Sequence, residues 1–235
     1  MTESEIRIRR YRAARERVLE RIAGACTRAG RGPGDVTLVA VSKTVPAEAL
    51  RDAVAAGLSL LGENRVQEGV AKAPEVPGAR WHLVGPLQSN KARRALEVFE
   101  AIESVDSVDL ARRLDRLAGE IHPGRRYPVL LEVNVDDDPA KAGFAPAGLE
   151  PALDQIAELS GLEVRGLMTI GRLVERAEDA RPTFRALRET SDRLRAAGAP
   201  LGGELSMGMT DDFELAIEEG ATMVRVGRAL FGPRT

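Results

Sequence analysis

Residues 36–46 read VTLVAVSKTVP, and this stretch decides how the rest of the chain is interpreted. Its first six residues are apolar or β-branched, which favours a buried strand. A lysine, Lys43, follows this run, and Pro46 is typical of the start of a helix. The stretch therefore predicts a strand, a turn and a helix, with a primary amine at the carboxyl end of the strand.

The same alternation of an apolar run and a helical segment continues along the chain. Strands are predicted at residues 36–42, 58–62, 80–84, 100–105, 127–135, 162–169, 203–206 and 222–226. Helices are predicted between them at residues 46–56, 64–73, 89–98, 107–119, 147–159, 178–197 and 211–219. A further amphipathic helix precedes the first strand, at residues 5–29.

Eight strand–helix units after one leading helix predict the α/β class and a (β/α)8 TIM barrel. We expect residues 1–235 to form a single domain, with residues 1–31 as an extra N-terminal helix packed on the barrel. An open, doubly wound sheet is the alternative, and it would be favoured if residues 203–206 formed no strand. In a barrel, the polar residues that follow the strands would meet at one face.

The composition is that of a soluble globular protein, with 43% apolar residues, 30% charged residues and a formal net charge of -2. Cys26 is the single cysteine, so no internal disulfide can form, and a reducing compartment is expected. The first residues lack the apolar segment of a secretory signal, and no apolar run approaches the ~20 residues that span a membrane. We therefore expect a cytoplasmic protein with no membrane partner.

Arginine dominates the basic residues, since 34 residues are basic and the lysines are Lys43, Lys72, Lys91 and Lys141. Many arginines lie in the leading helix, where Glu16 and Glu20 accompany them. This mixture favours a solvated helix face, because a nucleic-acid surface would carry aromatic residues and fewer acids. We therefore expect no nucleic-acid partner.

Lys43 is a candidate for covalent chemistry because of its place at the end of a buried strand. Partial burial disfavours the ammonium form and lowers the pKa of a lysine, which leaves some neutral amine at physiological pH. A neutral primary amine in a cleft is what Schiff-base formation requires. The alternative is a lysine whose ammonium group simply extends from the strand end into solvent.

Two loops near the carboxyl terminus are candidates for an anion site. The segments 205–214 and 226–233 each place a glycine and small or polar residues before a predicted helix, with Thr210 or Asp211 as a helix N-cap. Backbone amides and the helix dipole would favour an anion there. In barrels, the loops after the seventh and eighth strands frequently bind a phosphate group.

Arg225 lies inside a short apolar strand, on the same side as Gly227. A buried arginine needs a partner, which is either a barrel carboxylate such as Glu132 or Glu63, or a ligand. His82 is interpreted as a hydrogen-bonded core histidine. With two histidines and one cysteine, no transition-metal site is expected, and the P-loop, dinucleotide and nucleophile-elbow motifs are absent.

Several motifs, taken in this order, resemble the pyridoxal phosphate homeostasis proteins. They are AVSKT (40–44), GENRVQE (62–68), WHLVGPLQSNK (81–91), KAGF (141–144), RGLMTIG (165–171) and LSMGMTDDFELAIEEGATMVRVGRALFG (205–232). The resemblance runs from about residue 36 to the carboxyl terminus. It implies a fold shared with the N-terminal barrel of alanine racemase.

The resemblance also implies a cofactor and the residues that hold it. Pyridoxal 5'-phosphate (PLP) would form a Schiff base with Lys43, and Arg225 would approach the pyridine nitrogen. Asn64 would lie near the ring, and Met168 is interpreted as a core residue facing it. The phosphate contacts implied are Ser206, Gly208, Gly227 and Arg228.

The family resemblance implies PLP homeostasis without catalytic turnover, with PLP and apo PLP-dependent enzymes as partners. A PLP-dependent racemase-like enzyme is the alternative, but it needs a second base, and the tyrosines are Tyr11 and Tyr127, which we expect away from the mouth. The chain also continues for only about eight residues after the last predicted strand, where a racemase has a second domain. An aldolase-like lyase and an adaptor protein are weaker alternatives. We expect a monomer or a weak homodimer.

Overall fold

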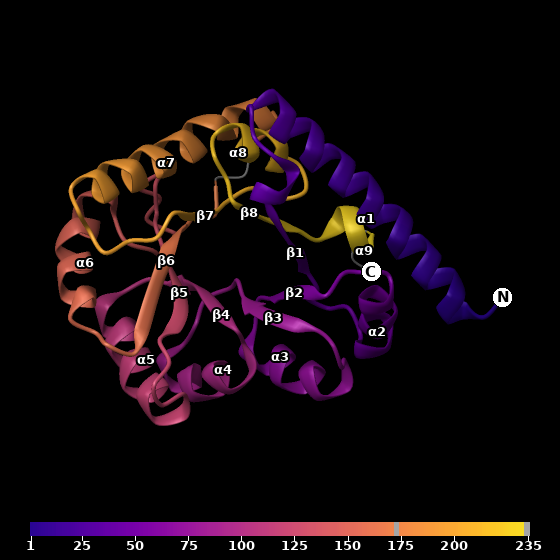
Figure 1. Cartoon of the computed structure of the whole chain (residues 1–235), viewed down its shortest axis with the longest axis horizontal. Helices are drawn as coiled ribbons and strands as arrows, with labels where there is room; N and C mark the ends of the chain where they lie inside the picture. The colour runs from indigo at the N-terminus through magenta and orange to yellow at the C-terminus, as the bar shows by residue number, and fades with distance from the viewer. Residues whose placement is uncertain (172–173, 233–235) are drawn as a thin grey trace.

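The computed structural model describes residues 1–171 and 174–232, and within them eight parallel strands close into a barrel (Figure 1). In order around the barrel, the strands are β1 (Thr37–Val41), β2 (Leu60–Glu63), β3 (Arg80–Leu83), β4 (Ala101–Val105), β5 (Tyr127–Glu132), β6 (Leu162–Met168), β7 (Glu204–Ser206) and β8 (Met223–Val226). The short β7 pairs with both β6 and β8, and β8 pairs with β1. The predicted barrel is confirmed, and the open sheet is wrong.

Helices surround the barrel in the order α1 (Glu3–Arg28), α2 (Ala47–Ala55), α3 (Val66–Lys72), α4 (Ala92–Val98), α5 (Val108–Ile121), α6 (Leu149–Ala157), α7 (Arg181–Ala196), α8 (Phe213–Glu218) and α9 (Arg228–Phe231). Short 3-10 turns are η1 (Pro33–Asp35), η2 (Ala73–Glu75), η3 (Ser89–Lys91), η4 (Pro146–Gly148) and η5 (Ala177–Ala180). The helices predicted at 89–98, 147–159 and 178–197 therefore begin as 3-10 turns. Residues 172–173 and 233–235, which fall within the predicted domain, lie outside the described residues.

The predicted fifth strand is too long, because the ladder ends at Glu132 rather than at residue 135. The chain folds back on itself beyond this point. Phe144 donates its amide to the Glu132 carbonyl, and Asn134 donates its amide to the Phe144 carbonyl. The apolar residues Val133 and Val135 therefore belong to a loop at the barrel mouth rather than to a longer strand.

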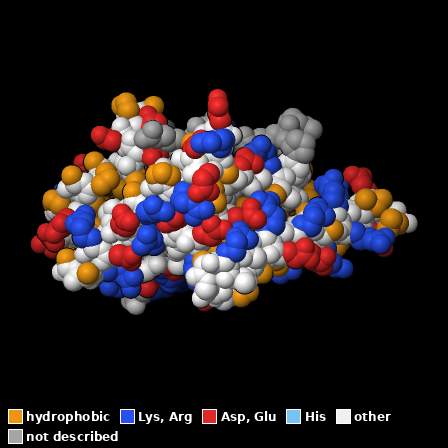
Figure 2. Space-filling model, turned by 90° about the horizontal axis from the view of Figure 1, so that it is seen from above, with side chains coloured by type: hydrophobic (Ala, Val, Ile, Leu, Met, Phe, Trp, Pro, Cys, Tyr) orange, Lys and Arg blue, Asp and Glu red, His pale blue; other side chains and the backbone are white. Residues whose placement is uncertain are grey.

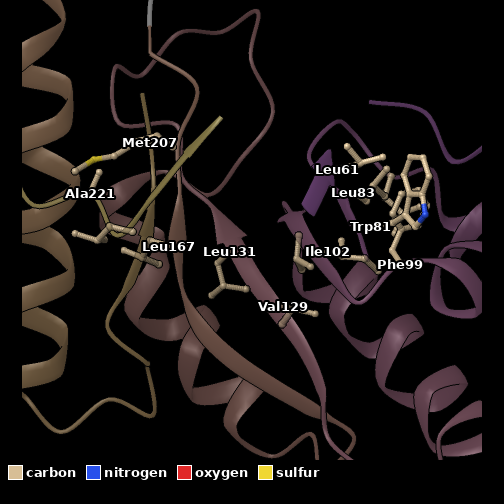
Figure 3. Packing of buried hydrophobic residues seen from close by; sticks show 14 of the residues in the cluster. Leu61, Trp81, Leu83, Phe99, Ile102, Val129, Leu131, Leu167, Met207 and Ala221 are labelled. Atoms are coloured by element: carbon tan, nitrogen blue, oxygen red, sulfur yellow. The ribbon is translucent and has the colours of Figure 1, made fainter. Parts of the chain in front are cut away.

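The apolar core lies mainly between the barrel and its helices. Figure 3 shows Leu61 and Leu83 of β2 and β3 beside Trp81 and Phe99, and this layer continues through residues of β4, β5 and β6. A second, smaller cluster fills the barrel interior and consists of Val39, Leu60, Val84 and Met223, with Val41 packed on it. Burial of each such side chain stabilises the fold by roughly 1.5–3 kcal/mol. The small interior cluster leaves room above it for polar side chains.

The leading helix α1 packs against α2, α8 and α9 on the outside of the barrel (Figure 1). Its apolar face is buried, and three of its arginines form ion pairs with acids of the neighbouring helices: Arg7 with Asp52, Arg21 with Glu214 and Arg28 with Glu218. These ion pairs attach the helix to α2 and α8, and the predicted solvated face is wrong only for Arg7, whose side chain is 17% exposed. Figure 2 shows positive and negative side chains interspersed over one face of the molecule.

Candidate functional site

Lys43 follows β1 at the carboxyl-terminal mouth of the barrel and is partly buried. Val39 and Val41 pack inside the barrel, whereas Ser42 bonds to the outward-facing Glu63, so the two-residue alternation assigns Lys43 to the inner side. The next residue, Thr44, has a φ angle of 67°. This left-handed conformation is uncommon for a β-branched residue, and it turns the chain sharply just after Lys43.

A continuous hydrogen-bonded network crosses the barrel interior below the mouth. His82 Nδ1 lies 2.7 Å from Glu103 Oε1, and the Ser206 hydroxyl donates to Glu103 Oε2 over 2.6 Å. Arg225 donates to Ser206 Oγ and to the Thr169 carbonyl, each over 2.7 Å. The network joins β3, β4, β7 and β8, and it fixes the Arg225 guanidinium in the barrel. His82 is thus the hydrogen-bonded interior histidine that the sequence indicated.

Ser206 occupies the centre of this network. A hydroxyl has one proton to donate, and Ser206 gives it to Glu103 while its oxygen accepts from Arg225. The side chain is fully buried at the end of β7 and points into the barrel. Ser206 therefore supports Arg225 in this structure, and its contact with a phosphate group stays a prediction.

Arg225 is 5% exposed and lies near several acids. Burial lowers its pKa, and the negative charges of Glu103, Glu132 and Asp212 oppose that shift. Among the described residues it forms no direct ion pair, because its hydrogen bonds go to the neutral oxygens of Ser206 and Thr169. Burial also raises the pKa of Glu132, and the positive charge of Arg225 opposes this rise. Glu132 therefore balances Arg225 through charge rather than through contact.

Of the two carboxylates suggested as alternatives to a ligand for Arg225, Glu132 and Glu63, the second is wrong. Glu63 faces the outside of the barrel, where its Oε1 accepts from Lys72 Nζ over 2.7 Å. The reason is the two-residue period of a strand: within β2, Leu60 faces the interior cluster, so Glu63, three residues later, faces the helices.

The loops after β7 and β8 come together at the mouth. Within the described part of the chain, the amides of Gly208, Gly227 and Arg228 donate no hydrogen bond, so they are available to an anion. Gly208 has a φ angle of 89°, and a Cβ there would lie 2.8 Å from Phe213 Cα, so the loop requires glycine. The exposed Arg228 side chain pairs with Asp211 and links the two loops.

The expected N-cap of the helix after β7 is wrong. Asp212, rather than Thr210 or Asp211, is the N-cap residue of α8, and its Oδ1 accepts from the Met209 amide over 2.6 Å. The helices α8 and α9 have six and four residues, so their dipoles add little. Any anion binding at these loops would depend on the individual amides.

The two remaining predicted residues lie at the same mouth. Met168 ends β6 and is fully buried, level with Glu132 of β5 and Ser206 of β7 in the strand register. Asn64 follows β2, and its backbone packs closely against Gly85, where a Cβ would lie 2.4 Å from the Asn64 carbonyl oxygen. The structure thus brings the predicted site residues to one end of the barrel.

Glu103 is a site residue that sequence reasoning did not identify. Glu103 is fully buried in β4, where it holds both His82 and Ser206. The signal was the second acid of the run EAIESV (100–105), which lies inside the predicted strand rather than at its start. An acid in a buried strand needs partners, so it would have been a reason to look for them inside the barrel.

The sequence comparisons agree with this geometry. The family model described as "Alanine racemase, N-terminal domain" matches residues 17–235. A pyridoxal phosphate homeostasis protein of Aquifex aeolicus is 44% identical over 220 residues, which are 93% of this chain and 96% of that protein. This chain belongs to the pyridoxal phosphate homeostasis protein family. The family member of Escherichia coli is 41% identical over 227 residues, covering 92% of this chain and 94% of that protein.

Solved structures extend the family comparison. PipY of Synechococcus elongatus, determined with PLP bound, superposes with a TM-score of 0.79 at 46% identity, covering 92% of this chain and 100% of PipY. An alanine racemase of Clostridium difficile superposes with a TM-score of 0.68 at 15% identity, covering 92% of this chain and 56% of the racemase. The racemase comparison shows a shared fold. The family's barrel therefore corresponds to about half of a racemase chain.

Proposed function

We propose that this protein binds PLP, holds it as a Schiff base on Lys43, and serves intracellular PLP homeostasis without catalytic turnover. The observation that carries the proposal is the convergence of three groups at one mouth: the Lys43 amine, the buried Arg225 guanidinium and the available loop amides. The PLP-bound structure of PipY, a relative at 46% identity, supports it. The described residues contain no helix long and apolar enough to cross a membrane, and we propose a cytoplasmic location.

The residues present fit the chemical groups of PLP. The Lys43 amine would condense with the PLP aldehyde, so that a carbon–nitrogen double bond forms and one water leaves. Arg225, which keeps protons beyond the two it gives to Ser206 and Thr169, would donate to the pyridine nitrogen. The amides of Gly208, Gly227 and Arg228 would hold the phosphate. Asn64 and Met168 would border the ring.

The same geometry argues against turnover. PLP supplies an electron sink when its pyridine nitrogen is protonated, and an arginine at that nitrogen disfavours the protonated form. Tyr127, the first residue of β5, donates its hydroxyl to the Phe99 carbonyl. Tyr11 packs edge-on against Phe231 in the outer layer. Neither phenol is placed as a second base opposite Lys43. We therefore favour a carrier over the racemase-like alternative.

Transfer of PLP to apo-enzymes tests the homeostasis proposal. We expect the loaded protein to restore the activity of an apo-aminotransferase, and a Lys43→Ala variant to deliver less cofactor, because Lys43 is the covalent holder. A scavenger of free PLP then separates transfer by contact, which continues, from transfer through solution, which stops. Failure to reactivate any apo-enzyme without scavenger would contradict the homeostasis role.

Racemisation tests the absence of turnover. We expect chiral chromatography to show no interconversion of D- and L-alanine above background when either is incubated with the PLP-loaded protein, because neither Tyr11 nor Tyr127 is placed as a second base. The Lys43→Ala variant sets the background. Multiple turnovers that disappear in this variant would establish a racemase-like enzyme instead.

A further inference from the structure

A buried polar cluster lies on the outer face of the barrel, directly beneath the turn that carries Lys43. Its centre is Glu63, the last residue of β2, which is fully buried. Glu63 Oε1 accepts from Ser42 Oγ over 2.8 Å and from Lys72 Nζ over 2.7 Å. Its second oxygen, Oε2, has no hydrogen-bond partner among residues 1–171 and 174–232. A buried carboxylate in this position depends on its cation.

That cation is Lys72, the last residue of α3, whose side chain is only 12% exposed. Besides Glu63, Lys72 Nζ donates to Glu68 Oε2 over 3.0 Å and to the Ser42 carbonyl over 3.1 Å. An ammonium group has three protons, so these partners use all of them. Lys72 is therefore a fixed structural cation that joins α3 to the end of β1.

Glu68 extends the cluster to the other side of Lys43. Its Oε2 accepts from the Thr44 amide over 3.1 Å as well as from Lys72. Although burial opposes ionisation, these two donors hold the pKa of Glu68 below its ordinary value. Thr44 needs such a support, because a left-handed backbone conformation is strained for a non-glycine residue.

The backbone on both sides of Lys43 is thus fixed by side chains of α3. Lys72 binds the carbonyl of the preceding residue, Ser42, and Glu68 binds the amide of the following residue, Thr44. We propose that Lys72, Glu63 and Glu68 are positioning residues, which fix the turn around Lys43 and so direct its amine into the barrel mouth. This inference rests on the proposed role of Lys43 as the covalent holder of PLP.

The test separates covalent attachment from simple binding in the full-length protein. Each variant is saturated with PLP, total bound PLP is measured by equilibrium dialysis, and the Lys43-linked fraction is measured by borohydride reduction and peptide mapping. We expect Lys72→Met to lower the linked fraction about tenfold, because a misplaced reacting group loses rate and equilibrium advantage. Total binding should change less, because Arg225 and the loop amides are untouched. Glu68→Gln should also lower the Lys43-linked fraction.

Two further lysine variants make the result specific. Lys91→Met is the matched control, since the described residues supply Lys91 with no ion pair, and it should behave like the wild type. Lys72→Arg keeps the cation and should restore much of the linked fraction. If Lys72→Met fails to fold by circular dichroism, Glu68→Gln decides, because the Glu68 side chain is 26% exposed and lies at the edge of the cluster.

The outcomes distinguish a failure of the positioning role from a failure of the proposed PLP-binding function. Wild-type linked fractions in both Lys72→Met and Glu68→Gln, or in Glu68→Gln alone if the first does not fold, would overturn the positioning role. Equal losses of linked and total PLP would also overturn it, since they indicate general damage to the site. Absence of Lys43-linked PLP in the wild type would instead refute the proposed function.

Discussion

Lys43→Arg is expected to abolish covalent attachment of PLP while the barrel stays folded. Arginine keeps the positive charge and a similar length, but a guanidinium does not supply the primary amine that condenses with an aldehyde. Borohydride reduction of the wild type should place the pyridoxyl mass on the peptide containing Lys43, and the variant should show none. We expect the affinity to fall roughly tenfold or more, which corresponds to ~1.4 kcal/mol.

The other lysines provide the controls for this experiment. Lys91→Arg should leave the pyridoxyl mass on Lys43 unchanged. The ammonium group of Lys72 donates to Glu63, Glu68 and Ser42, so we expect no pyridoxyl group on it. Label on Lys72, Lys91 or Lys141 in the wild type would contradict the assignment of Lys43 as the attachment site.

Arg225→Met is expected to destabilise the PLP-free protein by about 3 kcal/mol, because it removes the cation from a buried group of acids. For a chain of this size, the melting temperature should fall by roughly 6–12 °C. Arg225→Lys, which keeps the charge but loses the geometry of two hydrogen bonds, should be intermediate. Thermal unfolding followed by circular dichroism, without added PLP, measures both.

The destabilisation by Arg225→Met should also depend on pH. Burial already raises the pKa values of Glu132 and Asp212, and the Arg225 charge opposes both shifts. Without Arg225 the pKa values of Glu132 and Asp212 rise further. These two carboxyl groups then bind protons more tightly in the folded variant than in the unfolded chain. Stability is then lost as pH rises above the unfolded carboxyl pKa of about 4.3. The deficit should therefore be larger at pH 8 than at pH 5, and a deficit independent of pH would contradict this account.

Sequence periodicity was sufficient for the barrel and for the residues that follow its strands. Lys43 and Arg225 stand out because a charged residue in or after an apolar run is unusual and needs a chemical reason. The short β7 was also predicted, although three residues carry little periodicity of their own. In the structure it is defined by its neighbours, since Leu205 and Ser206 pair with β6 and Ser206 also with β8.

Other parts of the site depend on contacts that one sequence does not encode locally. Glu103 and Ser206 are 103 positions apart, and their hydrogen bond exists only because the barrel closes. Lys72 lies in a helix, where a lysine is ordinarily a solvent-exposed residue. The four-residue α9 has no interior periodicity, so only the loop around it was recognised. Long-range pairing, rather than residue type, decides these positions.

The network of His82, Glu103, Ser206 and Arg225 has a consequence for the order in which the chain acquires its native state. During synthesis, His82 and Glu103 leave the ribosome long before Ser206 and Arg225. A partial barrel would have to keep Glu103 in contact with water, because desolvating an unpaired carboxylate is costly. The interior can therefore become dry only when the last two strands have docked. We therefore expect the barrel to close cooperatively, when its last two strands dock, rather than strand by strand.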